Sequence, residues 1–291
     1  MNNQQDPLLT GKTCLVTGSS RGIGFETALG LARLGAHMII VSQNAEHCQA
    51  ALDQIIEEGG QNAGRYYVAD LSSQEEIRQL AVNIQQDYQK LDVLINNVGG
   101  WFRKFQKSPD GIEMTFALNH LSYFLLSGQL LPLLQKSPAA RIINVSSDAH
   151  RQAKSIHFDD PQFQHRYQPF GVYAHSKLAN VLFTYELARQ TTNSHLTVNA
   201  LHPGFVKTEL YRHFGIITPL VKFFAGLIGK SVVEGAQTPI YLASSPEVAE
   251  ITGKYFVDCE PVESSPVSYD ELQASRLWEI SEKMTGFKYP F

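Results

Sequence analysis

The stretch TGSSRGIG, Thr17–Gly24, decides the fold, because it joins the β-branched run Thr13–Thr17 to the amphipathic pattern Ile23–Leu34. A glycine turn between a strand and a helix lets backbone approach a pyrophosphate at the positive helix N-terminus. The spacing is G-x-x-x-G-x-G, and no Gly-Lys-Ser/Thr follows, which excludes a P-loop. An ordinary glycine-rich turn is the alternative, but its place directly after the first strand favours a dinucleotide site.

Strand-like and helix-like patterns alternate along the rest of the chain. The predicted strands are Thr13–Thr17, Met38–Val41, Arg65–Ala69, Val93–Asn96, Arg141–Val145, Thr197–Leu201 and Lys254–Val257. The predicted helices are Ile23–Leu34, Ala45–Glu58, Gln74–Tyr88, Ile112–Gln135, Val172–Gln190 and Val232–Leu242. Such alternation is typical of βαβ units, and strands that are apolar throughout are typical of a parallel sheet buried on both faces. We therefore expect an α/β, Rossmann-type doubly wound fold.

One domain is the simplest organisation for residues 1–291, because no repeat, low-complexity tract or linker interrupts the pattern. Its core spans residues 11–257. Residues 268–284 form a C-terminal helical extension with Leu272, Leu277, Trp278 and Ile280 as the apolar face.

Composition narrows the possible partners. A formal net charge of -4 with 18% charged residues provides no basic surface for nucleic acid. Cys14, Cys48 and Cys259 lie too far apart for a disulfide framework or a zinc site, so we expect no metal and a reducing, cytoplasmic location. We also expect neither a signal peptide nor a membrane span, which needs ~20 apolar residues.

The end of the second strand bears on the choice of cofactor. An acidic residue there would hold a ribose 2′-hydroxyl and repel a 2′-phosphate, but the strand ends with Ser42 and no carboxylate follows directly. Arg21, in the glycine turn, can pair with a phosphate at the same corner. The sequence therefore favours NADP(H) over NAD(H), with a solvated surface charge as the alternative for Arg21.

Tyr173 and Lys177 stand four residues apart in a helical pattern, and this spacing places them on one face. A nearby ammonium favours the phenolate of a tyrosine, whose reference pKa is ~10, and so suits it for acid/base work near neutrality. Alone, the pair could equally lie on the surface. Ser147 favours a catalytic role for the pair, because it ends the fifth strand, and the active crevice of a parallel sheet lies at the carboxyl ends of its strands.

In the order and spacing of these motifs the chain resembles the short-chain dehydrogenase/reductase superfamily over roughly Gly11–Val257. The resemblance implies seven parallel strands in the order 3-2-1-4-5-6-7. It makes Tyr173 the acid/base, Ser147 the group that orients a carbonyl, Lys177 the ligand of the nicotinamide ribose, and Asn119 the support of a proton relay. The cofactor residues it implies, with those of the glycine turn, are Gly18, Ser20, Arg21, Gly22, Ile23, Gly24, Ser42, Asp70, Leu71, Asn97, Val98, Gly99, Tyr173, Lys177, Pro203, Gly204, Val206 and Thr208.

A closer resemblance is to the retinol-dehydrogenase-like branch, in RIINVSSDAH (Arg141–His150), YAHSKLANVL (Tyr173–Leu182) and the insertion between Ser147 and Tyr173. That branch reduces or oxidises apolar aldehydes, ketones and alcohols, usually with NADP(H). The chain differs from it in Gln43, where an arginine is common, and in Val98, where alanine is usual. We also expect it to be without the N-terminal membrane anchor that is common in that branch.

Aromatic residues near the crevice are the predicted substrate contacts. Trp101 and Phe102 follow the fourth strand, and His150 and Tyr167 lie in the insertion before Tyr173. Apolar ligands favour such surroundings, although core packing for the first two and a structural role for His150 are the alternatives. Residues 205–230 are expected to contain a lid, and their segment 214–229 could instead be a membrane-surface helix or a dimer contact.

By the same resemblance the chain forms a homodimer or homotetramer in which helices 112–135 and 172–190 pair across a two-fold axis. The expected partner is a small apolar carbonyl compound or alcohol. Two alternatives stay open, because a fold does not fix a function. One is a non-catalytic sensor or scaffold that binds NADP, and the other is an epimerase or dehydratase that retains its cofactor.

Overall fold

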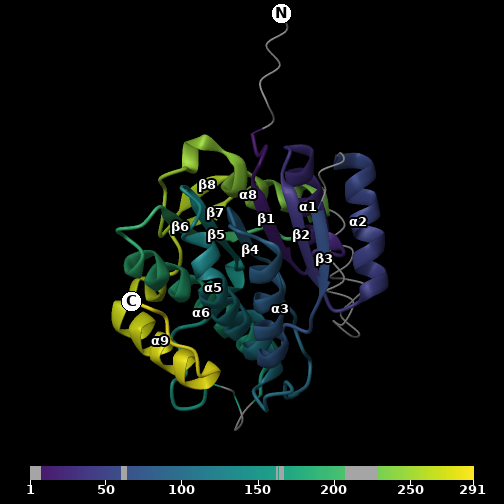
Figure 1. Ribbon diagram of the computed structural model, residues 1–291. Coiled ribbons are helices and arrows are strands. Elements are labelled where there is room, and N and C mark those ends of the chain that lie inside the picture. Colours follow the sequence, from purple (N-terminus) through teal and green to yellow (C-terminus); the bar gives the residue numbers. More distant parts are fainter. Residues whose placement is uncertain (1–7, 60–63, 162, 164–166, 207–228) are drawn as a thin grey trace, which may run out of the picture.

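The fold is built on one continuous sheet (Figure 1). The computed structural model describes residues 8–59, 64–161, 163, 167–206 and 229–291. Within these residues the sheet has the order β3-β2-β1-β4-β5-β6-β7-β8. The strands are β1 (Thr13–Thr17), β2 (His37–Ser42), β3 (Gly64–Val68), β4 (Val93–Asn96), β5 (Ala140–Val145), β6 (Leu196–His202), β7 (Tyr255–Val257) and β8 (Glu260–Val262). The doubly wound fold and the order of seven parallel strands are therefore confirmed.

The eighth strand was missed by the sequence analysis, which expected seven. β8 pairs antiparallel with β7 and is three residues long. Asp258 and Cys259 connect the two strands with φ angles of 52° and 66°. Two left-handed residues in a row suit a tight hairpin whose twist matches that of its strands. All three β8 residues are exposed, so no buried, apolar pattern marks this strand.

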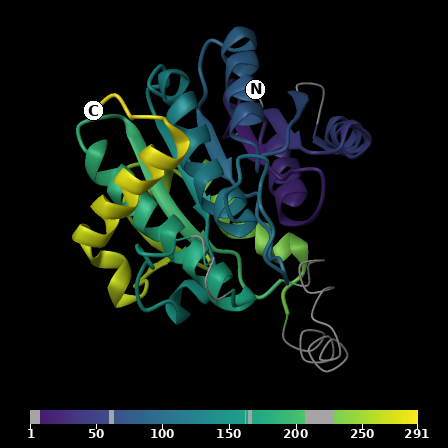
Figure 2. The ribbon, with the colours of Figure 1, turned by 90° about the horizontal axis from the view of Figure 1, so that it is seen from below.

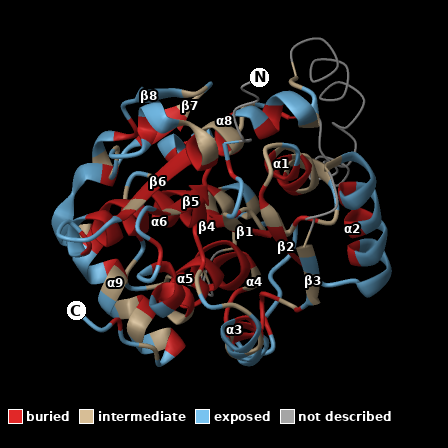
Figure 3. Cartoon of the chain, turned by 45° about the horizontal axis from the view of Figure 1, so that its top comes forward, coloured by how far each residue is buried: buried red, intermediate tan, exposed pale blue. Residues whose placement is uncertain are grey.

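Helices cover both faces of the sheet, and alternate strand residues supply the two cores. Leu15 of β1 packs in the core beneath α3, α5 and α6, while Cys14 and Val16 pack in the core beneath α1, α2 and α8. Figure 3 shows the buried strands enclosed between these two layers. The helices are α1 (Gly22–Arg33), α2 (Ala45–Gly59), α3 (Gln74–Asp87), α5 (Ser122–Leu134), α6 (Pro169–Gln190) and α8 (Val232–Ser244).

The predicted helix Ile112–Gln135 is interrupted near its start. A short helix α4 (Met114–Phe116) leads into a π-helical turn, η1 (Ala117–Leu121), and only then into α5. A π-turn widens the helix by one residue, a feature that is rare and frequently found at functional sites. The interruption carries Asn119 at its centre.

The C-terminal segment folds back over the helices that were expected to pair with a second subunit. α9 (Glu271–Thr285) begins at its cap Asp270 and packs along α6 (Figure 2). Trp278 lies edge-on to Phe124 of α5, and the Tyr289 hydroxyl donates to the Phe124 carbonyl oxygen at 2.8 Å. A two-fold pairing through α5 and α6 would therefore require this segment to leave its place.

Candidate active site

The glycine turn after β1 is tightly packed at Gly24 and open to solvent at Gly22. Gly18 and Gly22 have φ angles of 65° and 62°, which side chains other than hydrogen rarely allow. A Cβ on Gly24 would lie 2.4 Å from the Gly18 carbonyl oxygen, so the helix can start against the turn only with glycine there. At Gly22, in contrast, a Cβ would meet no atom within 4 Å. The turn thus leaves space beside the N-terminus of α1, as a bound pyrophosphate needs.

Hydrogen bonds join the glycine turn to the end of β4. The Thr17 hydroxyl oxygen accepts from the backbone N–H groups of Asn97 (2.9 Å) and Val98 (3.1 Å). The Asn97 amide donates to the Thr17 carbonyl oxygen at 2.8 Å. The structure therefore brings Asn97, Val98 and the turn together at one edge of the sheet. Thr17 was not among the predicted cofactor residues. Its position at the carboxyl end of β1 could have indicated that it belongs to the site.

The corner beside β2 contains the Ser20 and Ser42 hydroxyls, the Asp70 carboxylate and the backbone of Arg21. The Ser20 and Ser42 hydroxyls lie 2.8 Å apart, which links the glycine turn to the second strand. Arg21 is exposed in extended conformation at the N-cap of α1. Gln43 donates its amide hydrogen to Asp70 at 2.8 Å, and this Asp70 oxygen also accepts from the Ser72 N–H. Ile23, in the glycine turn, is half-buried, and Leu71, directly after Asp70, is buried.

Lys177 is the most unusual charge of the site. It is 4% exposed, and its Nζ donates to the Val145 carbonyl oxygen, at the end of β5, over 2.9 Å. The same nitrogen lies 5.8 Å from the ring centre of Tyr173, one helical turn earlier. Burial lowers the pKa of Lys177 to about 7, because an ammonium loses solvation in the interior. A lysine is thus held at the point where a helix, a strand end and a tyrosine meet.

Asn119 fixes the π-turn against the loop after β4. Its Oδ1 accepts from the Gly100 N–H at 2.7 Å, and its Nδ2 donates to the Gly100 carbonyl oxygen at 3.0 Å. Nδ2 also lies 3.0 Å from the Ser176 hydroxyl, next to Lys177 on α6. A Cβ on Gly99 would come within 3.3 Å of the Asn119 Oδ1 and 3.4 Å of the Lys177 Nζ. These three residues therefore converge on one small space.

Ser147 stands at the turn that follows β5. Its hydroxyl oxygen accepts from the Ala149 N–H at 3.2 Å and so caps the 3₁₀ turn η2 (Asp148–Gln152). Since that contact uses a lone pair, the hydroxyl hydrogen can point to a carbonyl oxygen in the crevice. The neighbouring Ser146 donates to the Lys177 carbonyl oxygen at 2.8 Å, which ties this turn to α6.

The segment after β6 closes the other side of the crevice. Gly204 has a φ of 86°, and a Cβ there would lie 2.6 Å from the Lys230 side chain. Val206 is buried and pairs with Lys230 as an isolated parallel bridge. The predicted cofactor residue Thr208 lies outside the described residues. The predicted membrane or dimer segment 214–229, except its last residue, and most of the predicted lid lie outside them as well.

The four residues expected near the substrate have different surroundings. Trp101 and Phe102 are half-buried, and the Tyr167 hydroxyl donates to the Phe102 carbonyl oxygen at 2.7 Å. His150 is fully buried, its Nδ1 lies 2.7 Å from the Ser147 carbonyl oxygen, and its Nε2 accepts from the Ser265 N–H at 3.0 Å. A substrate contact of this ring would need one of these hydrogen bonds to break.

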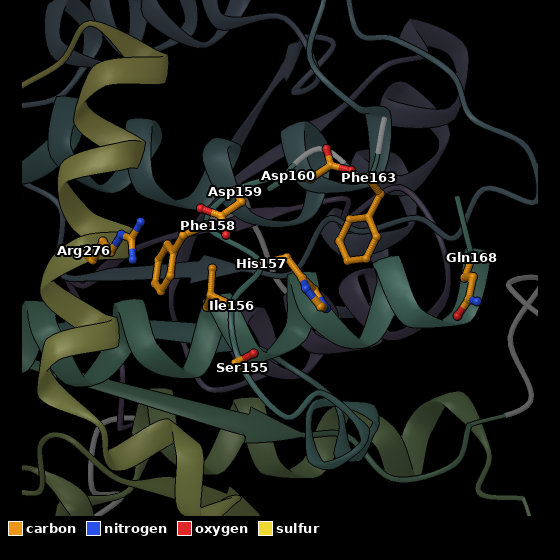
Figure 4. A pocket seen from close by; sticks show the side chains of 9 residues that line it. All are labelled: Ser155, Ile156, His157, Phe158, Asp159, Asp160, Phe163, Gln168 and Arg276. Atoms are coloured by element: carbon orange, nitrogen blue, oxygen red, sulfur yellow. The ribbon is translucent and has the colours of Figure 1, made fainter. Parts of the chain in front are cut away.

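A cavity of about 520 Å³ lies between the insertion and α9 (Figure 4). Arg276 of α9 stacks over the Phe158 ring at 4.3 Å on one side of it. None of the predicted catalytic residues lines this cavity. Its lining comprises Ser155, Ile156, His157, Phe158, Asp159, Asp160, Phe163, Gln168 and Arg276.

Tyr123 of α5 is a supporting residue that the sequence analysis missed. Its hydroxyl donates to the Val98 carbonyl oxygen at 2.8 Å and lies 3.3 Å from that of Val145. It therefore bridges the ends of β4 and β5, and its ring centre lies 5.8 Å from the Lys177 Nζ. In an apolar helix pattern such as SYFLLSGQLL, nothing distinguishes this tyrosine from an ordinary core residue.

Comparison with known proteins agrees with this arrangement. The family model described as short chain dehydrogenase matches residues 12–215. Retinol dehydrogenase 14 of Homo sapiens is 42% identical over 298 residues, which cover 97% of this chain and 88% of that protein. Among solved structures, a putative uncharacterized protein from Mycobacterium Paratuberculosis has a TM-score of 0.78 at 30% identity, covering 99% of this chain and 98% of that one. The RhlG/NADP active-site complex of Pseudomonas aeruginosa has a TM-score of 0.71 at 27% identity, covering 91% and 100%.

The chain belongs to the short-chain dehydrogenase family. Within that family it falls in the retinol-dehydrogenase-like branch. It is an oxidoreductase that acts on alcohol or carbonyl groups and binds a nicotinamide cofactor. The residues present fit such a group, because a Cβ at Gly22 would meet no atom within 4 Å, which leaves the backbone of the turn open to a close-lying dinucleotide.

Proposed function

We propose that this protein transfers a hydride between NADP(H) and the carbonyl or alcohol carbon of an apolar aldehyde, ketone or alcohol. One observation carries the proposal: Lys177 is buried beside Tyr173 and bonded to the end of β5, directly before the serine pair. Burying a lysine costs free energy, and groups whose pKa is strongly perturbed are often found at functional sites. A sensor that binds NADP would need the lysine for the ribose but would not need the Tyr173 hydroxyl beside it.

The chain's own residues handle the proton and the carbonyl oxygen. The bound nicotinamide supplies the hydride for reduction or accepts it in oxidation. Ser147 donates its hydroxyl hydrogen to the substrate oxygen, where negative charge develops during reduction. Tyr173 gives its phenolic proton to that oxygen, and in oxidation it takes the proton back. An unprotonated alkoxide in a crevice shielded from water would be costly, so the donor must stand ready.

Lys177 serves two groups in this proposal. Its ammonium favours the phenolate form of Tyr173 and so makes the tyrosine a better acid and base near neutrality. The same ammonium would hold the hydroxyls of the nicotinamide ribose. Asn119, through its contacts with Gly100 and Ser176, holds the loop and the helix that border this space, and it supports the proton relay.

The preference for NADP(H) rests on the corner at β2. Arg21 is exposed at the N-cap of α1 and can pair with a 2′-phosphate, and Ser20 and Ser42 present hydroxyls there. The Asp70 carboxylate, which Gln43 links to the end of β2, accepts hydrogen bonds from the Gln43 amide and from the Ser72 N–H. These two hydrogen bonds reduce the capacity of Asp70 to accept from a ribose hydroxyl.

Apolar side chains around the crevice support an apolar substrate. Phe170, three residues before Tyr173 on α6, is 51% exposed, and Phe205, after β6, is 44% exposed. Phe105 is 38% exposed and meets the Tyr167 ring edge-on at 5.8 Å. Exposed aromatic residues near polar catalytic groups are typical of pockets for apolar ligands. The relative in Homo sapiens is named for retinol, an apolar alcohol, and this lends support to the substrate class.

Assembly and location are proposals of the same kind. Since α9 and Tyr289 lie over α6 and α5, we expect any homodimer or homotetramer to use another face. Sedimentation of the intact chain and of a variant altered on an exposed face would test this. A cytoplasmic location is supported by three unpaired cysteines. Among the described residues, no helix has the length and apolar character to cross a bilayer.

The test is a panel of apolar aldehydes and ketones, with NADPH consumption followed by absorbance for the intact protein and Tyr173→Phe. The substitution keeps the ring and removes only the hydroxyl, so NADPH should still bind. Turnover should fall by about 10²–10⁴, the worth of a positioned acid or base. Near-normal turnover of Tyr173→Phe would remove the assignment. NADPH binding without turnover of any compound would favour the sensor instead.

A further inference from the structure

We propose that His150 is a positioning residue for Ser147, through which the C-terminal segment 255–265 sets the place of the serine. The inference rests on the proposed function, since it assigns Ser147 the substrate oxygen. It concerns residues of this chain alone.

His150 holds Ser147 through two hydrogen bonds to one carbonyl oxygen. The Ser147 carbonyl oxygen accepts from the His150 backbone N–H at 3.0 Å and from its ring Nδ1–H at 2.7 Å. The Ser147 hydroxyl accepts from the Ala149 N–H of the same turn. Both the backbone and the side chain of the serine are thus held by η2, so a shift of this turn moves the hydroxyl.

The opposite side of the His150 ring contacts the C-terminal segment. The His150 Nε2 accepts from the Ser265 N–H at 3.0 Å, and its ring centre lies 4.8 Å from that of Tyr255. A backbone N–H can only donate, so Nε2 must be the acceptor and Nδ1 must carry the hydrogen. The ring is fully buried, and burial lowers the pKa of His150 because its charged form loses solvation. A single neutral tautomer therefore joins two distant segments of chain.

Two further contacts tie η2 to the same C-terminal segment. The Tyr255 hydroxyl donates to Asp148 at 3.2 Å, and Arg151 donates to the Glu263 carbonyl oxygen at 2.6 Å. Arg151 and Asp148 are exposed, so those contacts are weaker than the buried one at His150. His150 is the one of the three that reaches Ser147 directly, and this singles it out for the test.

The test compares three substitutions of His150. Asparagine can place an amide hydrogen near the position of Nδ1 and so keep the bond to Ser147. Glutamine can place an amide oxygen near Nε2 and keep the bond to Ser265. Leucine keeps neither. For each variant, kcat, KM, the NADPH dissociation constant and the melting temperature are measured.

The expected result is a graded loss of turnover with cofactor binding within twofold of normal. His150→Leu should lower kcat by about 10- to 100-fold, since small misplacement of a catalytic group has effects of this size. His150→Asn should retain more turnover than His150→Gln. Equal kcat in all variants, or a loss that follows melting temperature alone, would overturn the proposal.

A double-mutant cycle shows whether His150 acts through Ser147. In a Ser147→Ala background, His150→Leu should cause no further loss of kcat. The same fold loss in both backgrounds would mean that His150 acts by another route. Ring-nitrogen NMR shifts give a readout without turnover: His150, whose pKa burial lowers, should be the Nδ1–H tautomer from pH 7 to 8. An Nε2–H tautomer, or titration in this range, would contradict the geometry, whereas absent turnover in the unaltered protein would contradict only the proposed function.

Discussion

The glycine turn and the C-terminal segment lie at opposite ends of the chain and are held in opposite ways. The turn Thr17–Gly24 depends on backbone geometry and on contacts that its own motif provides, together with Asn97. The segment 258–291 depends on contacts with distant residues, among them Phe124 and His150. The difference suggests that the binding and catalytic residues can be recognised in the sequence by type and spacing, whereas the contacts that support the site are visible only in the folded chain.

This comparison predicts that substitutions in the two regions lower different properties of the protein. Substitutions near the turn and in the Tyr173–Lys177 pair should remove cofactor affinity or turnover with little loss of stability. Substitutions in the C-terminal segment should lower stability first. Three variants can break or sharpen that contrast.

Lys177→Met should have the largest effect. Turnover should fall by about 10²–10⁴ and NADPH affinity should also drop, because one ammonium serves both the ribose and Tyr173. Steady-state kinetics and NADPH binding measure the two losses separately. Unchanged cofactor affinity would contradict the double role.

The same variant has a defined pH dependence of stability. Burial lowers the pKa of Lys177 from 10.5 to about 7, so between these values the unfolded chain binds more protons at this residue. The stability of the unaltered, cofactor-free protein therefore rises with pH through this window. Lys177→Met lacks that rise, so its gain in melting temperature should be largest near pH 6 and vanish toward pH 10. A gain that is the same at all pH values would be inconsistent with the buried charge.

Arg21→Ala should have the next largest effect, confined to one cofactor. The NADPH dissociation constant should rise by about 10- to 150-fold, equivalent to about 1.5–3 kcal/mol for a lost charge-assisted contact. The NADH dissociation constant and the melting temperature should stay within error, since Arg21 is exposed. Calorimetric titration with both cofactors measures the difference. Equal dissociation constants in the unaltered protein would remove the basis of the NADP(H) preference.

Tyr289→Phe tests the other region and should have the smallest effect. It removes the hydrogen bond to the Phe124 carbonyl oxygen but keeps the buried ring. The free energy of unfolding should fall by about 0.5–1.5 kcal/mol, while kcat changes by less than twofold. Urea denaturation and the NADPH assay measure the two quantities. A large loss of kcat at normal stability would erase the contrast between the regions.

Much of the fold could be predicted because its signals are local. Buried strands such as Leu94–Ile95 are apolar on both faces, and glycine turns follow strands in a fixed pattern. The antiparallel β8 escaped prediction because it is short and exposed. The π-turn around Asn119 escaped as well, since no break in the sequence period of Ile112–Gln135 marks it, and the contacts of Asn119 with Gly100 appear only in the fold.

The candidate site divides in the same way. Tyr173, Lys177 and Ser147 stand out by residue type and spacing, and the fold brings their elements together at one edge of the sheet. The link from His150 to Ser265 spans 115 residues, and the hydroxyl of Tyr123 reaches two strand ends at once. Such contacts leave no periodic or compositional trace, so only the folded chain reveals them.

The most direct test of the catalytic assignment is the pH profile of alcohol oxidation at saturating NADP⁺ in the unaltered protein and in Lys177→Met. The account predicts a rate that rises through a group titrating below the ~10 of a free tyrosine, and a shift of that midpoint to higher pH when the ammonium is removed. Saturating cofactor removes the affinity loss, and the midpoint then belongs to the coupled Tyr173–Lys177 pair, since burial brings the pKa of Lys177 to about 7 in the cofactor-free protein. Superimposable profiles with the same midpoint would contradict the account.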